Sequence, residues 1–138
     1  IAVLGSGAVG VEFASIFRRF GSEVTLIELL PRIVPNEDEA VSAELEKSFK
    51  KRGIAVRTAT KVTSAKVKSG SVTLEMQGAS GKSETLTAAL LLVATGRGPV
   101  TEGLGVEEAG HTEPAEPEPK AQPSAGFRLE NCRSHGHA

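Results

Sequence analysis

The sequence begins with an apolar run, Ile1–Leu4, that leads directly into a glycine-rich turn and then into a helical pattern. The turn has the form G-x-G-x-x-G, with its glycines at Gly5, Gly7 and Gly10. A strand, this turn and a helix in succession are typical of a βαβ unit that binds the pyrophosphate of a dinucleotide. The first glycine permits the tight turn, the second lets the backbone approach the phosphates, and the third allows close helix–sheet packing. The motif predicts an α/β fold built on a parallel sheet.

The segment after the turn continues this pattern. Apolar residues recur at a helical period over 11–20, and Gly21 is the expected C-terminal stop. Residues 23–27 predict a second buried strand that ends at Glu28, 18 residues beyond Gly10. A carboxylate there can accept both hydroxyls of an adenosine ribose and repels a 2′-phosphate. We therefore predict NAD rather than NADP, with the loop residue Arg32 as the nearby cation that favours the alternative.

Two alternatives stay open on spacing alone. A Rossmann-like βαβ unit that binds nothing would show the same elements, although strand, turn, helix, second strand and acid all agree with binding. Glu12 is either a solvated carboxylate that suits the positive end of the helix dipole, or a residue that faces the nicotinamide end of the cofactor. The spacing favours the solvated carboxylate.

A second helix and a third strand are predicted next. Asn36 precedes three acidic residues and is the expected N-cap, with Glu39 at the N3 position. The helical pattern ends at Gly53, and residues 54–56 form a short apolar strand. A βαβαβ half of a dinucleotide-binding fold requires this order.

The pattern then changes to short β-branched segments, at 61–67, 72–77 and 83–87, which predict an antiparallel meander. Residues 90–93 form a continuous apolar run, as expected of a strand buried on both faces. The loop 94–99 leaves the carboxyl end of that strand, where ligands of parallel sheets bind. The predicted fold is a Rossmann-like doubly wound parallel sheet with an inserted antiparallel β-meander.

Bulk properties exclude several classes. A formal net charge of −1 gives no reason to expect nucleic acid or an acidic membrane surface as a partner. The longest apolar run, 88–94, is too short to span a bilayer. The single cysteine, Cys132, excludes a disulfide framework within one chain, and we take the compartment as cytoplasmic. Because the chain starts at Ile1, inside a predicted strand, we expect it to be a piece of a longer protein.

The composition shifts again near Gly110, where proline and glutamate replace large apolar residues. We predict an NAD-binding domain over 1–110 and a tail over 111–138 that is disordered or non-native. Cys132, His135 and His137 lie close together, but we expect no metal site on such a tail.

These motifs together resemble the NAD domain of the FAD-dependent pyridine nucleotide-disulfide oxidoreductases. The resemblance covers Ile1 to Gly110 and is carried by G-x-G-x-x-G-V-E-F, G-S-E-V-T-L-I-E, L-P-R-I-V-P, the helix from Asp38 to Gly53, K-V-T, V-A-T-G-R-G-P and T-E-G-L-G-V-E. The sequence looks most like the dihydrolipoamide dehydrogenase branch, with mercuric reductases and NADH oxidases as alternative branches.

The resemblance implies roles for single residues. The glycine turn would wrap the pyrophosphate and Glu28 would hold the adenosine ribose. Val62 would line the adenine side, and Gly96 would approach the nicotinamide half. For Glu12 the resemblance favours the role near the nicotinamide. The expected cofactor-binding residues are Gly5, Ser6, Gly7, Ala8, Val9, Gly10, Val11, Glu12, Glu28, Val62 and Gly96.

The family's redox cysteine pair belongs to an upstream domain that binds most of the FAD, and its catalytic histidine–glutamate pair belongs to a downstream interface domain. Both are missing here, so we expect no catalytic residue in this chain and no activity from it alone. Cys132 cannot replace a dithiol couple. In the complete enzyme, a homodimer, dihydrolipoamide on a lipoyl-bearing protein or as a small dithiol would reduce NAD⁺ through FAD.

Two rival hypotheses belong to other classes. A stand-alone NAD-sensing module would need neither flavin nor disulfide, but also neither the meander nor the loop after residue 93. A non-functional gene fragment is the third possibility, which the change of composition near Gly110 supports. We hypothesise a truncation or frameshift at that point.

Overall fold

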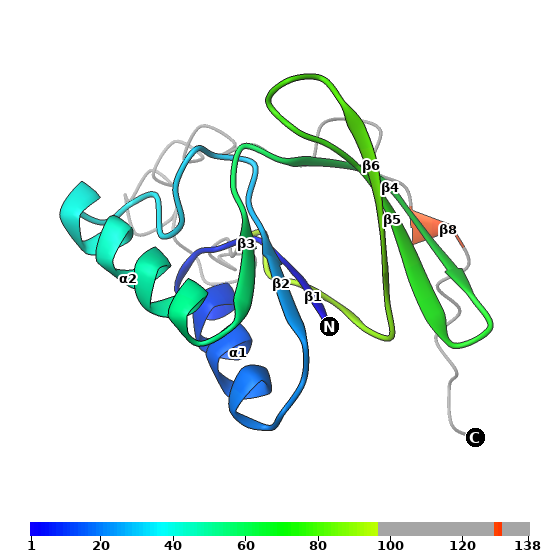
Figure 1. Cartoon of the computed structure of the whole chain (residues 1–138). Coiled ribbons are helices and arrows are strands. Elements are labelled where there is room, and N and C mark those ends of the chain that lie inside the picture. Colours follow the sequence, from blue (N-terminus) through cyan, green and yellow to red (C-terminus); the bar gives the residue numbers. More distant parts are fainter. Residues whose placement is uncertain (97–128, 131–138) are drawn as a thin grey trace, which may run out of the picture.

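The structure is a computed structural model that describes residues 1–96 and 129–130. Its elements, labelled in Figure 1, are β1 (Ala2–Leu4), α1 (Ala8–Arg19), β2 (Val24–Ile27), α2 (Glu39–Lys51), β3 (Ile54–Arg57), β4 (Lys61–Lys68), β5 (Ser71–Gln77), β6 (Ser83–Ala88), β7 (Leu91–Val93) and β8 (Leu129–Glu130). They form two sheets of four strands each.

The first sheet is parallel and has the strand order β3-β2-β1-β7. Strand β1 lies between β2 and β7, with Val3 opposite Leu26 on one side and Leu92 on the other. The chain enters the sheet at the central strand β1, and β2 and then β3 are added outward on one side. The glycine turn and its flanking apolar runs predicted this arrangement. The predicted α/β class is therefore confirmed.

Both helices cover one face of this parallel sheet (Figure 1). Ala14 of α1 and Phe49 of α2 are buried against it, together with Val3, Leu26 and Ile54 from the strands. The end of α1 is held to the end of α2 by hydrogen bonds between arginine side chains and the neighbouring backbone. This packing and these hydrogen bonds therefore fix the position of α1 relative to the carboxyl end of β1.

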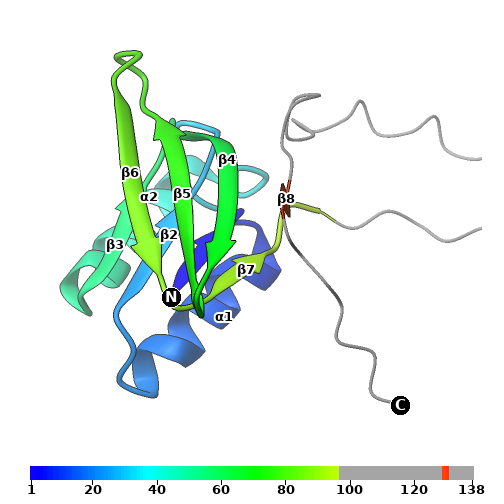
Figure 2. The same cartoon turned by 90° about the vertical axis from the view of Figure 1, so that its right-hand side faces the viewer.

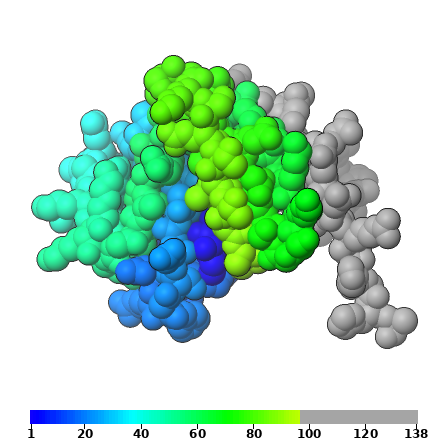
Figure 3. All heavy atoms as spheres, turned by 45° about the vertical axis from the view of Figure 1, so that its right-hand side comes forward, coloured from blue at the N-terminus to red at the C-terminus, as the bar shows by residue number. Residues whose placement is uncertain are grey.

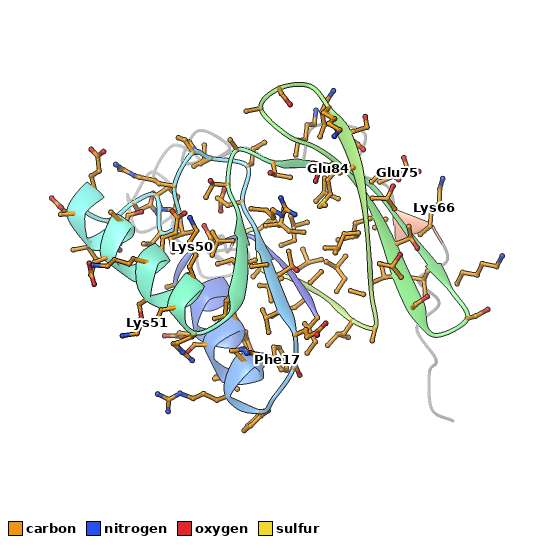
Figure 4. All side chains as sticks on the ribbon, viewed as in Figure 1. Phe17, Lys50, Lys51, Lys66, Glu75 and Glu84 are labelled. Carbon is orange, nitrogen blue, oxygen red and sulfur yellow. The ribbon has the colours of Figure 1, made fainter. Side chains whose placement is uncertain are left out.

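The predicted antiparallel meander, strands β4, β5 and β6, covers the other face (Figures 1 and 2). Alternate residues of β5, Val72, Leu74 and Met76, are buried against the parallel sheet, as the period of two in a strand requires. The outward face carries an exposed ion pair, Lys66 to Glu75 at 3.5 Å (Figure 4). In the space-filling view the meander packs directly beside the N-terminal residues (Figure 3).

Strand β8 lies parallel to β4, with Leu129 opposite Ala65 and Glu130 opposite Lys66. These two residues belong to the segment predicted as a disordered or non-native tail. The rest of that segment lies outside the described residues.

The last parallel strand differs from its prediction. Residues 90–93 were expected to be buried on both faces, but Leu90 and Val93 are each 47% exposed. Within the described residues β7 pairs only with β1, so it is an edge strand. A continuous apolar run gives the apolar character of a strand but not its place in the sheet.

The start of α2 also differs. Asp38, not Asn36, is the N-cap, and its side chain accepts a hydrogen bond from the Ala40 N–H at 2.8 Å. The preceding residues form a turn in which the Glu37 N–H donates to the Val34 carbonyl at 2.9 Å. This turn delays the helix by two positions, so the prediction of Asn36 was wrong.

Among the described residues, neither helix combines the length and the apolar composition that a membrane-spanning helix needs.

Candidate functional site

The glycine turn joins β1 to α1 at the carboxyl edge of the parallel sheet, and two of its glycines serve close packing. Gly5 has φ +96°, and a Cβ there would lie 2.6 Å from the Ala94 carbonyl oxygen. A Cβ on Gly10 would overlap the carbonyl oxygen of Gly5. The first turn of α1 therefore lies directly on the end of β1, and β1 directly beside the exit from β7. Side chains at these two positions are excluded by the protein's own backbone.

Gly7 is different. Its backbone, φ −65° and ψ −177°, is one that any residue can adopt, and no described atom lies within 4 Å of a Cβ built there. It is the N-cap of α1, and among the described residues no side chain caps that helix end. The first N–H groups of a helix have no partner within the helix. The space beside Gly7 and the uncapped donors form a cradle that suits an anion.

Other residues of the turn flank this cradle. Ala8 is exposed, and Val9 and Val11 are half-buried. Glu12 is exposed on the helix surface, so the structure leaves it free to be a solvated carboxylate or to face a cofactor.

Glu28, at the end of β2, is buried at 8% exposure beside the glycine turn. Its Oε2 accepts from the Ser6 N–H at 2.8 Å and from the Ser6 hydroxyl at 2.7 Å. Its Oε1 accepts from the Leu30 N–H at 2.9 Å. A carboxylate offers about four acceptor positions. The described donors therefore leave room for one further hydrogen bond, whereas the sequence suggested that Glu28 accepts two from a ribose.

Ser6 is completely buried, at 0% exposure. Its carbonyl accepts from the Val34 N–H at 2.9 Å, while its N–H and hydroxyl both donate to Glu28. Ser6 was expected to contact the pyrophosphate with the rest of the turn. In the structure its polar groups form hydrogen bonds within the protein. Ser6 can therefore contribute to a site by holding Glu28 in position.

The loop after β2 holds Ser6 in this position through the hydrogen bond from Val34. Val34 has φ +39°, a conformation that β-branched residues rarely adopt and that typically costs about 1–3 kcal/mol. The buried hydroxyl of Ser42, on α2, donates to the carbonyl of Ile33 at 2.6 Å and holds the loop in place. No local sequence signal indicates Ser42 or Val34, because both act through contacts made only in the folded chain.

Arg32 lies in the same loop, and its guanidinium is turned toward the loop's own backbone. It donates to the Pro35 carbonyl at 3.0 Å and the Glu37 carbonyl at 3.4 Å, and lies 4.0 Å from the Glu39 carboxylate. The cation that could have favoured a 2′-phosphate is therefore engaged in stabilising the approach to α2.

The remaining predicted site residues, Val62 and Gly96, lie outside the glycine turn. Val62 is 7% exposed, and its side chain packs in the core between the sheets, so only its backbone can line an adenine subsite. Beside it, the Thr60 N–H donates to the Glu28 carbonyl at 2.9 Å. Gly96 has φ +152°, and no described atom lies within 4 Å of a Cβ built there. The structure thus brings the turn and Glu28 together and places Gly96 just after the end of β7.

No cluster that could hold a metal is found among residues 1–96 and 129–130. Cys132, His135 and His137 lie outside the described residues.

The chain matches the family model of the pyridine nucleotide-disulphide oxidoreductases over residues 1–115. It is 45% identical over 111 residues to dihydrolipoyl dehydrogenase of Thermus scotoductus, which covers 80% of this chain and 24% of that protein. Identity to the mitochondrial dihydrolipoyl dehydrogenase of Schizosaccharomyces pombe is 42% over 111 residues, 80% of this chain and 22% of that protein. The chain thus spans about a quarter of the length of these relatives.

Similarity to solved structures supports the same family assignment. The HOCl-induced flavoprotein disulfide reductase RclA of Escherichia coli is 31% identical with a TM-score of 0.63, over 79% of this chain and 24% of that one. LpdA of Mycobacterium tuberculosis is 30% identical with a TM-score of 0.63, over 77% and 22%. With the family model covering most of the sequence, the chain belongs to the pyridine nucleotide-disulphide oxidoreductase family.

Proposed function

We propose that residues 1–110 form the NAD(H)-binding domain of an FAD-dependent, dihydrolipoyl dehydrogenase-like oxidoreductase. The observation that carries the proposal is the cradle at Gly7, where open space and uncapped helix donors lie beside the buried carboxylate of Glu28. An anion at the turn and a hydroxyl-bearing group at the carboxylate are the two chemistries that this arrangement accommodates.

The residues present fit the phosphate half of a dinucleotide. Gly7 needs no special backbone angle and makes no close contact, so neither fold nor packing explains a glycine there. A pyrophosphate that approaches the backbone does explain it, because a Cβ would occupy the same space. The N–H groups at the start of α1 would donate to the phosphate oxygens.

The carboxylate supports NAD rather than NADP. A 2′-phosphate would lie against Glu28, and like charges at close range repel. Arg32, which could compensate, already donates to two backbone carbonyls. Glu28 would instead accept one ribose hydroxyl at Oε1.

In the complete enzyme we propose the transfer of two electrons from dihydrolipoamide, free or on a lipoyl-bearing protein, to NAD⁺, giving lipoamide, NADH and a proton. FAD, bound mainly outside this chain, would supply the redox chemistry between the dithiol and the nicotinamide. This chain's residues would bind and orient NAD(H). Its single cysteine cannot form a dithiol couple, so the chain alone should not catalyse the reaction. The complete enzyme would be a homodimer.

Calorimetric titration of the 138-residue chain tests the proposal. We expect saturable binding of one NADH per chain, at least about tenfold tighter than NADPH, which corresponds to about 1.4 kcal/mol. Equal or tighter binding of NADPH would contradict the role of Glu28. Absence of binding to either nucleotide would overturn the proposed function.

A further inference from the structure

The contact between Ser6 and Glu28 joins residues far apart in the sequence and uses every polar group of Ser6. The N–H and hydroxyl of Ser6 both donate to Oε2 of Glu28, at 2.8 and 2.7 Å, and both hydrogen bonds are buried. The Ser6 carbonyl accepts from Val34 at 2.9 Å, which holds the residue from the opposite side. Ser6 is thus held by the backbone of Val34 and in turn holds the carboxylate of Glu28 through two hydrogen bonds.

The two oxygens of Glu28 are consequently not equivalent. Both acceptor positions of Oε2 are taken by Ser6, in buried hydrogen bonds. Oε1 accepts only from Leu30 among the described donors, and that hydrogen bond is partly buried. Among the described contacts, Oε1 is therefore the carboxylate oxygen that keeps one open acceptor position.

We propose that Ser6 is a positioning residue for cofactor specificity, whose hydroxyl fixes the Glu28 carboxylate so that Oε1 meets the cofactor ribose. This inference rests on the proposed function. A glutamate side chain loses rotamer freedom when it must hold one geometry, and Ser6 imposes that geometry before any cofactor arrives. Without the hydroxyl, the carboxylate keeps the Ser6 N–H but loses one of two buried anchors.

The test is S6A in the 138-residue chain, with NADH and NADPH titrated separately. Loss of one hydrogen bond that pre-organises the carboxylate should weaken NADH binding about fivefold. NADPH, which gains nothing from Glu28, should change by less than about twofold, so the preference for NADH narrows. S6C, which keeps the volume but donates weakly, should give an intermediate preference and covers the case in which S6A does not fold.

S71A is the control. The hydroxyl of Ser71 also donates one hydrogen bond, to the Lys68 carbonyl at 3.1 Å, but it lies at the turn between β4 and β5 and not at Glu28. S71A should leave the ratio of NADH to NADPH affinity unchanged. If S6A also leaves that ratio unchanged and weakens both nucleotides equally, Ser6 has only a structural role and the inference is overturned.

Amide hydrogen exchange supplies a readout that needs no cofactor. The Leu30 N–H is held by Oε1 of Glu28, so its exchange should be faster in S6A than in the parent chain. Unchanged exchange at Leu30 would show that Ser6 does not hold the carboxylate, whatever the nucleotide affinities. A parent chain that binds no NADH would instead overturn the proposed function, and the inference with it.

Discussion

Helices α1 and α2 lie on the same face of the parallel sheet, but their first turns have opposite chemistry. In α2 the N-cap carboxylate of Asp38 accepts from the Ala40 N–H, and Glu39 adds an acid to the first turn. In α1 the N-cap is Gly7, no described side chain caps the helix, and its first turn contains no acid.

We infer from this difference that the N-terminus of α2 serves the fold, whereas the N-terminus of α1 is available to a ligand. In α2 the Asp38 carboxylate accepts from one of the first N–H groups, and Glu39 adds a negative charge near the positive dipole end. The first N–H groups of α1 are left to water or to an anion, and Gly7 keeps the approach open. Three substitutions test this difference: one places a carboxylate at the N-terminus of α1, one adds a methyl group there, and one removes the cap of α2.

The largest effect should come from G7D, which gives α1 the kind of cap that α2 has. The carboxylate would fill the cradle and repel a pyrophosphate, so NADH affinity should fall by roughly a hundredfold or more. Folding should be preserved, because Asp is a good N-cap residue. Calorimetry with a parallel thermal melt measures both quantities, and NADH binding at parent strength would contradict the assignment of the cradle.

G7A should have a smaller effect, because it adds bulk without charge. A methyl group in the cradle should weaken NADH about tenfold, from the cost of about 1.4 kcal/mol for displacing the phosphates. Gly78 is the matched control, since no atom of the described residues lies within 4 Å of a Cβ built there either. G78A should bind NADH as the parent does. Equal effects of the two substitutions would mean that Gly7 has no special place in binding.

D38A should affect stability alone. Removing the cap of α2 should cost about 1 kcal/mol, seen as a lower urea midpoint with an unchanged slope. NADH affinity should change by less than about twofold, because Asp38 contacts neither the glycine turn nor Glu28 among the described hydrogen bonds. A large loss of affinity in D38A would show that the two helix ends are not independent.

Local patterns predicted most of the fold. The glycine turn, the strand before Glu28 and the alternating residues of β5 each follow from short-range rules, and all were found where expected. The turn's packing glycines, Gly5 and Gly10, follow from the same motif. Such features need no knowledge of distant residues.

The remaining features depend on contacts that these short-range rules do not contain. The choice of Asp38 over Asn36 depends on a turn that the Arg32 side chain supports through two carbonyls. The burial of Ser6 and its bonds to Glu28 depend on how β1 and β2 align, which no residue near Ser6 reveals. The exposure of Val93 depends on which strands flank β7. Composition and period carry no information about these neighbours.

The most direct test of the central claim is to follow backbone amide chemical shifts while NADH is added to the 138-residue chain. We expect saturable shifts at Gly7, Ala8, Val9 and Leu30, and none along β5. Shifts confined to the meander, or none at the turn when NADH is saturating, would contradict the claim that the uncapped end of α1 and Glu28 form the cofactor site.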